Sequence, residues 1–130
     1  MSDPSPPRRV LVIDDDDAVR TVAAAALERV GGWSVSTASS GAEGIAAAAR
    51  LSPDAIVLDV MMPELDGPTV LGRLRRDPAT QAIPVVFLTA RVAGVGHGEL
   101  DALDAAGVLI KPFDPMTLSR DLSAILGFGP

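Results

Sequence analysis

The residues of this chain that could do chemistry stand at the ends of short apolar runs. Five polar residues directly follow runs that are typical of buried strands: Asp14 and Asp15, Asp59, Thr89 and Lys111. A carboxylate at the end of a buried strand is costly unless something pairs with it. Acids, a hydroxyl and an ammonium in corresponding places therefore indicate a site for a cation and a phosphoryl group.

Such a cluster favours phosphoryl chemistry on an aspartate. Neighbouring carboxylates repel one another and raise at least one pKa unless cations intervene. Lys111 supplies one positive charge, and a hard divalent ion with oxygen ligands, with Mg²⁺ as the expected one, would supply the rest. Such an ion neutralises charge in phosphoryl transfer, and one carboxylate can be the nucleophile. We assign that role to Asp59, which stands alone at its strand end.

The other members of the cluster take supporting roles. Asp14 and Asp15 form a pair suited to hold the metal. Thr89 would hydrogen-bond a phosphoryl oxygen, and Lys111 would balance its charge. The next acids in the run have a simpler interpretation, since Asp17, with Asp16 as the other candidate, would cap the first helix.

The elements that must position these residues alternate along the chain. Short apolar or β-branched stretches between turn signals predict strands at 8–13, 33–38, 55–59, 84–88 and 108–110. Helical patterns predict an apolar stripe from Val19 through Val22 to Val30, then helices at 41–50, from Gly67-Pro68, over 99–106 and from Pro115. This alternation implies a mainly parallel sheet covered on both faces. Right-handed crossovers bring the carboxyl ends of all strands to one edge, where ligands bind.

Four segments taken in order resemble the receiver domains of two-component response regulators. They are Val12-Ile13-Asp14-Asp15-Asp16, Leu58-Asp59 through Asp66-Gly67, Leu88-Thr89-Ala90 and Ile110-Lys111-Pro112-Phe113. The resemblance runs from about Arg9 to Leu126. It implies a flavodoxin-like (CheY-like), doubly wound α/β fold with a five-stranded parallel sheet of order 2-1-3-4-5 and five helices.

The resemblance also implies a function for the cluster. Asp59 would accept a phosphoryl group from a histidine kinase or a histidine phosphotransfer protein. Mg²⁺ would be held by Asp14, Asp15, Asp59 and the backbone carbonyl of Met61. The bond between Lys111 and Pro112 would be cis.

One position departs from the family pattern. Receivers often carry Tyr or Phe three residues before the lysine, and that ring changes rotamer on activation. This chain has Val108 there and no Tyr at all. The usual aromatic readout cannot operate in that form, although phosphorylation could still act on Thr89 and the loop after it. The glycines at 94, 96 and 98 are either loop punctuation or a segment that reorders.

Composition limits the remaining classes. A chain of 130 residues with 48% hydrophobic and 3% aromatic residues fits one aliphatic domain. We expect a disordered lead over 1–7, a receiver over 8–127 and a short tail over 128–130. The net charge of −6 argues against a nucleic-acid partner. The chain has no Cys, no apolar stretch near the roughly 20 residues of a membrane span and no signal peptide, so we expect a cytoplasmic monomer with no membrane partner.

The sequence therefore predicts a stand-alone response regulator that works as a phosphorylation-dependent switch or phosphorelay intermediate. It would assist its own phosphorylation and dephosphorylation but would not otherwise be an enzyme, and it would have room for a downstream protein target. Two alternatives stay open. One is a degenerate receiver that binds proteins constitutively, which Val108 favours. The other is a phosphatase of the haloacid-dehalogenase type, whose two acids are spaced like Asp14 and Asp16.

Overall fold

The fold is a five-stranded parallel sheet between two layers of helices, as the sequence predicts. The computed structural model describes residues 6–90 and 104–128. The strands lie in the order β2-β1-β3-β4-β5. Their bounds are β1 Arg9–Ile13, β2 Ser34–Ala38, β3 Ala55–Asp59, β4 Val85–Ala90 and β5 Gly107–Lys111. The predicted strands agree with these bounds to within two residues at each end.

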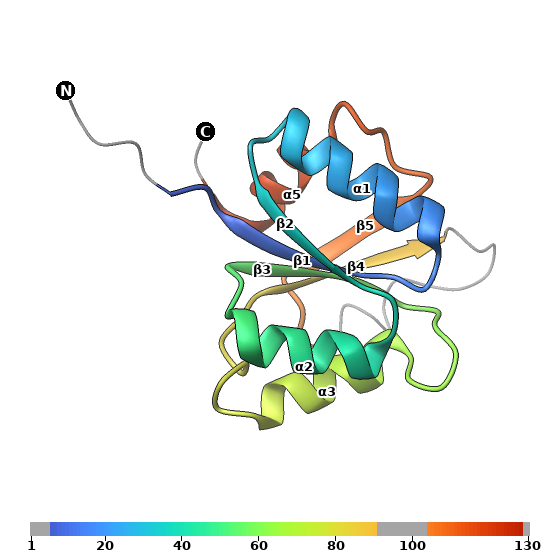
Figure 1. Ribbon diagram of the computed structural model, residues 1–130, viewed down its shortest axis with the longest axis vertical. Helices are drawn as coiled ribbons and strands as arrows, with labels where there is room; N and C mark the ends of the chain where they lie inside the picture. The colour runs from blue at the N-terminus through green and yellow to red at the C-terminus, as the bar shows by residue number, and fades with distance from the viewer. Residues whose placement is uncertain (1–5, 91–103, 129–130) are drawn as a thin grey trace.

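Two helices cover each face of the sheet (Figure 1). On one face lie α1 (Asp17–Arg29) and α5 (Leu118–Leu126), and on the other lie α2 (Gly41–Leu51) and α3 (Gly67–Arg76). The described residues thus contain four of the five predicted helices. The helix predicted over 99–106 falls mostly outside the described residues, and its last residues, 104–106, form a bend rather than a helix. The glycine segment at 94–98 also lies outside them.

Alternate side chains of β1, an inner strand of the sheet, enter two separate cores. Leu11 and Ile13 join the core under α2 and α3, whereas Val10 and Val12 join the core under α1 and α5. Both cores are largely aliphatic, and Phe87 is the largest side chain that is fully buried. A strand that is buried on both faces must be apolar at every position, which explains the unbroken apolar runs in the sequence.

Two helix starts differ from the prediction. The N-cap of α1 is Asp16 rather than Asp17, because the Asp16 side chain accepts hydrogen bonds from the N–H groups of Ala18 and Val19. The last helix begins at Leu118 rather than at Pro115. Residues 115–117 form a turn instead, in which the Asp114 carboxylate accepts a 2.9 Å hydrogen bond from the N–H of Met116.

The predicted stripe on α1 is only partly buried. Ala23, Ala26 and Leu27 enter the core, but Val22 and Val30 are 42% and 48% exposed. Apolar spacing alone could not show how much of this face the rest of the fold covers. Val22 and Val30 are thus corrections to the predicted buried face.

The ends of the described chain meet at the edge of the sheet opposite the strand ends (Figure 1). Pro6 and Pro7 are exposed before β1, while residues 1–5 and 129–130 lie outside the description. Phe128, in the predicted tail, packs on Trp33 with ring centroids 6.1 Å apart. The Arg8 guanidinium lies 3.9 Å from the centre of the same ring.

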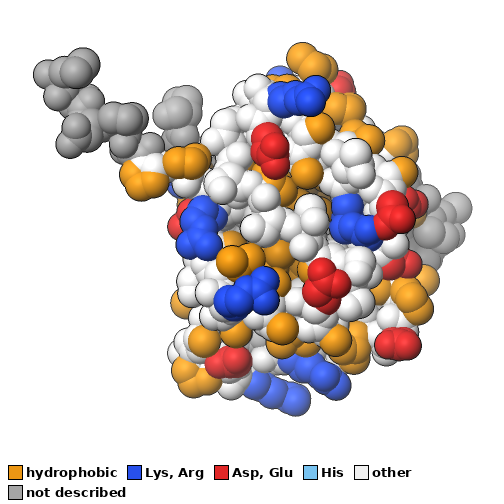
Figure 2. Space-filling model, viewed as in Figure 1, with side chains coloured by type: hydrophobic (Ala, Val, Ile, Leu, Met, Phe, Trp, Pro, Cys, Tyr) orange, Lys and Arg blue, Asp and Glu red, His pale blue; other side chains and the backbone are white. Residues whose placement is uncertain are grey.

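No helix among the described residues has the length and apolarity to cross a membrane. On the face shown in Figure 2, basic and acidic side chains are interspersed among neutral and apolar ones.

Candidate functional site

The sheet brings the predicted acids together at one edge. Asp14 directly follows β1, and Asp59 is the last residue of β3, its neighbour in the sheet. Oxygen atoms of Asp14, Asp15 and Asp59 all lie within 4.8 Å of one another. The gathering of these three carboxylates, which are distant in sequence, is therefore as predicted.

Lys111 bridges the two buried acids. Asp14 and Asp59 are 0% and 3% exposed, whereas Asp15 is open to solvent. The Lys111 Nζ lies 2.9 Å from Asp14 Oδ2 and 3.3 Å from Asp59 Oδ1. The bond from Lys111 to Pro112 is cis, as the resemblance implies. Two buried negative charges thus share one ammonium, and the exposed third acid adds to the negative excess.

Burial and charge shift two pKa values at this site. Burial, followed by the charge of Asp14, raises the pKa of Asp59 to about 6, although Lys111 and the N–H of Met61 favour its ionised form. Burial lowers the pKa of Lys111, but its 2.9 Å contact with Asp14 Oδ2 and the charges of Asp59 and Asp14 outweigh that effect. The net shift of the Lys111 pKa is upward. The lysine therefore stays charged while the carboxylates compete for it.

The acids have the features of a divalent-cation site. Asp14 Oδ2 is buried, and no donor among the described residues gives it a well-aligned hydrogen bond, in spite of the nearby ammonium. An incompletely satisfied buried carboxylate oxygen calls for a further partner. Three carboxylates against one lysine leave negative charge in excess, and their oxygens are the hard ligands that Mg²⁺ prefers. These residues fit the predicted ion.

Thr89 and Met61 are the two remaining predicted site residues. Thr89 follows Leu88, which pairs with Asp59 in the sheet, so it lies at the same edge. However, its hydroxyl donates a 3.2 Å hydrogen bond to the carbonyl of Ala90, and no contact with the acids is seen within the described residues. The N–H of Met61 donates to Asp59 Oδ1 at 3.3 Å, and its side chain is 75% exposed. The role of the Met61 carbonyl stays a prediction.

In the loop after Asp59, the backbone of Gly67 lies very close to the backbone of Asp59 and Val60, which residue spacing does not predict. The N–H of Gly67 donates to the carbonyl of Val60 at 2.9 Å. A Cβ atom on Gly67 would lie 2.6 Å from the Asp59 carbonyl oxygen. Because that oxygen is backbone, a side chain here would displace the end of β3 itself. Gly67 opens α3 as predicted, but the close contact could only be seen in three dimensions.

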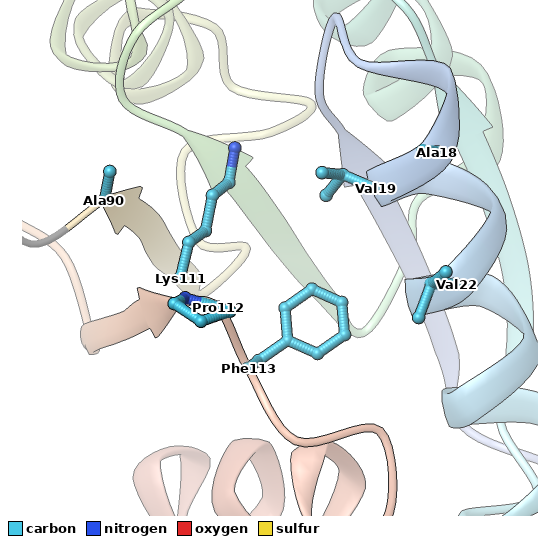
Figure 3. A pocket seen from close by; sticks show the side chains of 7 residues that line it. All are labelled: Ala18, Val19, Val22, Ala90, Lys111, Pro112 and Phe113. Atoms are coloured by element: carbon cyan, nitrogen blue, oxygen red, sulfur yellow. The ribbon is translucent and has the colours of Figure 1, made fainter.

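An open apolar pocket of about 430 Å³ adjoins the acids. It lies between α1 and the segment that follows β5, and Lys111 belongs to its lining (Figure 3). In Figure 3 the ring of Phe113 faces Val19 and Val22, while the Lys111 side chain extends towards the end of β3. Phe113 thus packs partly against the core and also lines a surface. The sequence pattern does not predict the pocket, because the apolar stripe places Val22 on a buried face.

Comparison with known proteins agrees with the geometry. The sequence model of the response regulator receiver domain matches residues 10–123. The chain belongs to the response regulator receiver family. The DNA-binding dual master transcriptional regulator RpaA of Synechocystis is 41% identical over 120 residues, which are 91% of this chain and 48% of that protein. Response regulator PleD of Caulobacter vibrioides is 40% identical, over 92% of this chain and 26% of its own length.

This receiver spans half or less of the length of those two curated relatives. Two solved structures are closer to it in extent. The chemotaxis protein CheY4 of Vibrio cholerae has a TM-score of 0.83 and 31% identity, covering 92% of this chain and 99% of that one. The receiver domain of sensor histidine kinase PA1611 of Pseudomonas aeruginosa has a TM-score of 0.81 and 29% identity, covering 94% and 99%. The latter structure has a magnesium ion coordinated in its active-site cleft.

Proposed function

We propose that Asp59 of this receiver accepts a phosphoryl group from a histidine kinase or a histidine phosphotransfer protein in a Mg²⁺-dependent reaction. The observation that carries the proposal is the shared lysine: Lys111 lies between the buried Asp14 and Asp59 while Asp15 stays open. A structural ion pair needs only one acid per lysine. The surplus acids are accounted for if the site takes up a cation and then a phosphoryl group.

Each residue has a definite part in the transfer. An Asp59 carboxylate oxygen forms the new O–P bond as the P–N bond to the donor's histidine breaks, and the imidazole leaves with the electron pair and takes a proton. The Lys111 ammonium, already 3.3 Å from Asp59 Oδ1, balances the incoming negative charge. Thr89 would have to turn its hydroxyl from the Ala90 carbonyl to the new phosphoryl oxygens.

Asp14, Asp15, Asp59 and the Met61 carbonyl would hold the ion. When bound, Mg²⁺ neutralises charge on the phosphoryl group and orients it for in-line attack. A magnesium ion in the cleft of the PA1611 receiver supports this part of the proposal.

The apolar pocket gives the phosphodonor a place to dock. A donor must bring its phosphohistidine to Asp59, and the exposed Val22 and the half-buried Phe113 offer an apolar surface beside Lys111. Exposed apolar surface of this kind is typical of a protein contact. We assign the pocket to an apolar side chain of the donor domain next to its histidine.

We further propose that the chain works as a switch or relay component rather than as an enzyme acting on free substrates. A phosphatase of the haloacid-dehalogenase type would use Asp16 as an acid-base residue. Here the Asp16 carboxylate accepts hydrogen bonds from two N–H groups at the start of α1, so it is engaged as a cap. Val108, which stands at the position of the usual aromatic residue, packs against the core under α2 and α3. The phosphorylation signal would therefore have to pass through Thr89 and the segment that follows it.

Phosphorylation is tested with acetyl phosphate and MgCl₂, followed by intact-mass spectrometry. We expect one added phosphate on the wild-type chain, none with EDTA and none on Asp59→Asn. Undiminished labelling of the Asp59→Asn variant would refute the assignment. A target that binds the free and the beryllofluoride-loaded protein equally well would instead favour the constitutive binding module.

A further inference from the structure

Arg20, in the first turns of α1, contacts the backbone of the buried acid Asp14. One nitrogen of its guanidinium donates a 2.7 Å hydrogen bond to the Asp14 carbonyl, and another pairs with the Asp17 carboxylate. The Arg20 side chain is only 17% exposed, whereas that of Asp17 is 91% exposed. An ion pair to so exposed a partner contributes little by itself. The contact with the carbonyl is therefore the one that matters for the site.

Asp14 needs such a contact because it lies beyond the strand ladder. The pairing of β1 with β2 and with β3 ends at Ile13 in both registers. The Asp14 N–H still donates to the carbonyl of Ala38 at 3.1 Å. Its carbonyl, in contrast, accepts the hydrogen bond of the Arg20 guanidinium.

The turn that Arg20 closes also carries Asp15. The N–H of Asp16 donates to Asp14 Oδ1 at 2.9 Å, and the Asp16 side chain caps α1. Within the part of the chain that the structure describes, the exposed Asp15 carboxylate makes no hydrogen bond or ion pair. Its place near Asp14 and Asp59 is thus set by the backbone of the turn between Asp14 and Asp16.

We propose that Arg20 is a positioning residue for the divalent-cation site: by binding the Asp14 carbonyl, it fixes the turn that presents Asp14 and Asp15. This inference rests on the proposed function, because it concerns the affinity of the same acids for Mg²⁺. The guanidinium of arginine carries several N–H donors in a fixed, forked arrangement. It can therefore bind the Asp14 carbonyl and the Asp17 carboxylate at once, which a lysine cannot do.

The sign of the effect separates positioning from plain electrostatics. Arg20 is a positive charge close to a cation site, so its charge alone opposes Mg²⁺ binding. If charge dominates, Arg20→Ala binds Mg²⁺ more tightly than the wild type. If positioning dominates, it binds more weakly, by on the order of tenfold, as is usual when partners that orient metal ligands are lost. Arg20→Lys keeps the charge and can still donate one hydrogen bond to the Asp14 carbonyl, but it cannot hold Asp17 at the same time, so its affinity should be intermediate.

The experiment is a Mg²⁺ titration of the metal-free proteins followed by backbone amide NMR shifts of Asp16 and Met61. Arg29→Ala is the control, because it removes the same charge from the exposed last turn of α1. We expect weaker binding for Arg20→Ala, an intermediate value for Arg20→Lys and no change for Arg29→Ala. Unfolding midpoints in EDTA report separately on stability, since a purely structural role would lower the midpoint and leave the Mg²⁺ affinity unchanged.

These outcomes distinguish failure of the proposed function from failure of the role of Arg20. If the wild-type chain shows no saturable Mg²⁺ response, the proposed function itself fails. If the wild type binds Mg²⁺ and Arg20→Ala binds equally well or more tightly, the role of Arg20 fails and the proposed function stands. Should Arg20→Ala not fold, a wild-type affinity for Arg20→Lys would overturn the role of the fork.

Discussion

At the scale of single residues, the site holds more negative than positive charge. Asp14 and Asp59 are both buried and both lie within 3.3 Å of one ammonium, that of Lys111. Taking charged groups out of water is costly, and one lysine cannot fully offset two carboxylates. Burial, followed by the charge of Asp14, raises the pKa of Asp59, whereas the two carboxylates raise the pKa of Lys111 against the effect of burial.

The raised pKa of Asp59 predicts how the stability of the metal-free protein depends on pH. Because the folded state raises the Asp59 pKa from 3.8 to about 6, the folded protein binds more protons than the unfolded chain between these values. The free energy of unfolding should therefore fall as the pH rises from about 4 to about 6 and then level off. The expected loss is at most about 3 kcal/mol. Urea unfolding at a series of pH values in EDTA measures it.

The control for this prediction is Asp59→Asn, which removes the titrating group at nearly constant shape. The difference in unfolding free energy between the variant and the wild type should favour the variant more at pH 7 than at pH 4. Parallel pH profiles for the two proteins would contradict the raised pKa. Added Mg²⁺ should flatten the wild-type profile, since the ion favours the ionised carboxylate.

Single residues also show which features of the site can be predicted from the sequence and which cannot. The acids and Lys111 were predictable because each follows an apolar run, and parallel strands bring such ends together. That the Thr89 hydroxyl hydrogen-bonds a phosphoryl oxygen stays a prediction. In this structure the hydroxyl donates to the Ala90 carbonyl, and residue spacing does not determine a rotamer. Arg20 was overlooked because an arginine on an amphipathic helix is typical of an exposed face, and only the folded turn shows what it reaches.

At the scale of elements, the loop between β3 and α3 determines where Asp59 stands. Gly67 lies against the backbone at Asp59 and Val60, and a Cβ on it would be within 3.0 Å of both. Residue 72, in the middle of α3, is also a glycine, but nothing lies within 4 Å of the place its Cβ would occupy. The chain therefore contains a matched pair of glycines in the same helix.

We predict opposite effects for the two glycine-to-alanine variants. Gly67→Ala should destabilise the fold by roughly 1–3 kcal/mol, because the loop must move to admit the methyl group. It should also weaken Mg²⁺ binding, since the end of β3 moves with the loop. Gly72→Ala should stabilise the fold by up to about 1 kcal/mol through helix propensity. Urea unfolding and the Mg²⁺ titration measure both effects, and equal stability of the two variants would contradict the close-contact argument.

The exposed valines of α1 give a second test at this scale. Val22 lines the pocket beside Lys111, whereas Val30 is similarly exposed at the far end of the helix. If a phosphodonor docks at the pocket, Val22→Asp should slow transfer from a kinase by roughly tenfold or more, because a carboxylate would be buried beside Phe113 in the complex. Val30→Asp should have no such effect.

The donor in this assay is the kinase that phosphorylates the wild-type chain fastest in a phosphotransfer profile. Acetyl phosphate serves as the second donor, because it is too small to use the pocket. Labelling of Val22→Asp by acetyl phosphate should match that of the wild type. Equal loss with both donors would show that the substitution damages the site itself rather than docking.

Elements differ in how far their pattern determines them. The inner strands were predictable because a strand that is buried on both faces is apolar at every position, as the inner strand β1 shows. The start of α5 was not, since the Asp114 side chain favours a turn over 115–117 where periodicity favoured helix. The burial of α1 was overestimated for a related reason: periodicity gives the direction of a face but not the extent of the surface that covers it.

At the scale of the whole molecule, the site and the chain ends lie at opposite edges of the sheet (Figure 1). Strand ends gather the acids at one edge. At the other edge, Phe128 packs on Trp33, whose indole N–H donates a 3.0 Å hydrogen bond to the Ser119 hydroxyl of α5. The Arg8 guanidinium covers the Phe128 ring and so links the start of the chain to its end.

This separation predicts that stability can be changed at one edge without affecting chemistry at the other. Phe128→Ala removes an aromatic pair and a cation–π contact, which together contribute about 1–2 kcal/mol. We expect a loss of that size in the free energy of unfolding and a change in the fluorescence of Trp33, the one tryptophan of the chain. Acetyl phosphate labelling of the folded variant should stay at the wild-type rate. Met116→Ala, at a 70% exposed position, is the control and should change none of the three measurements. A slower labelling rate for Phe128→Ala, measured where it is fully folded, would show instead that the two edges are coupled through α5 and the sheet.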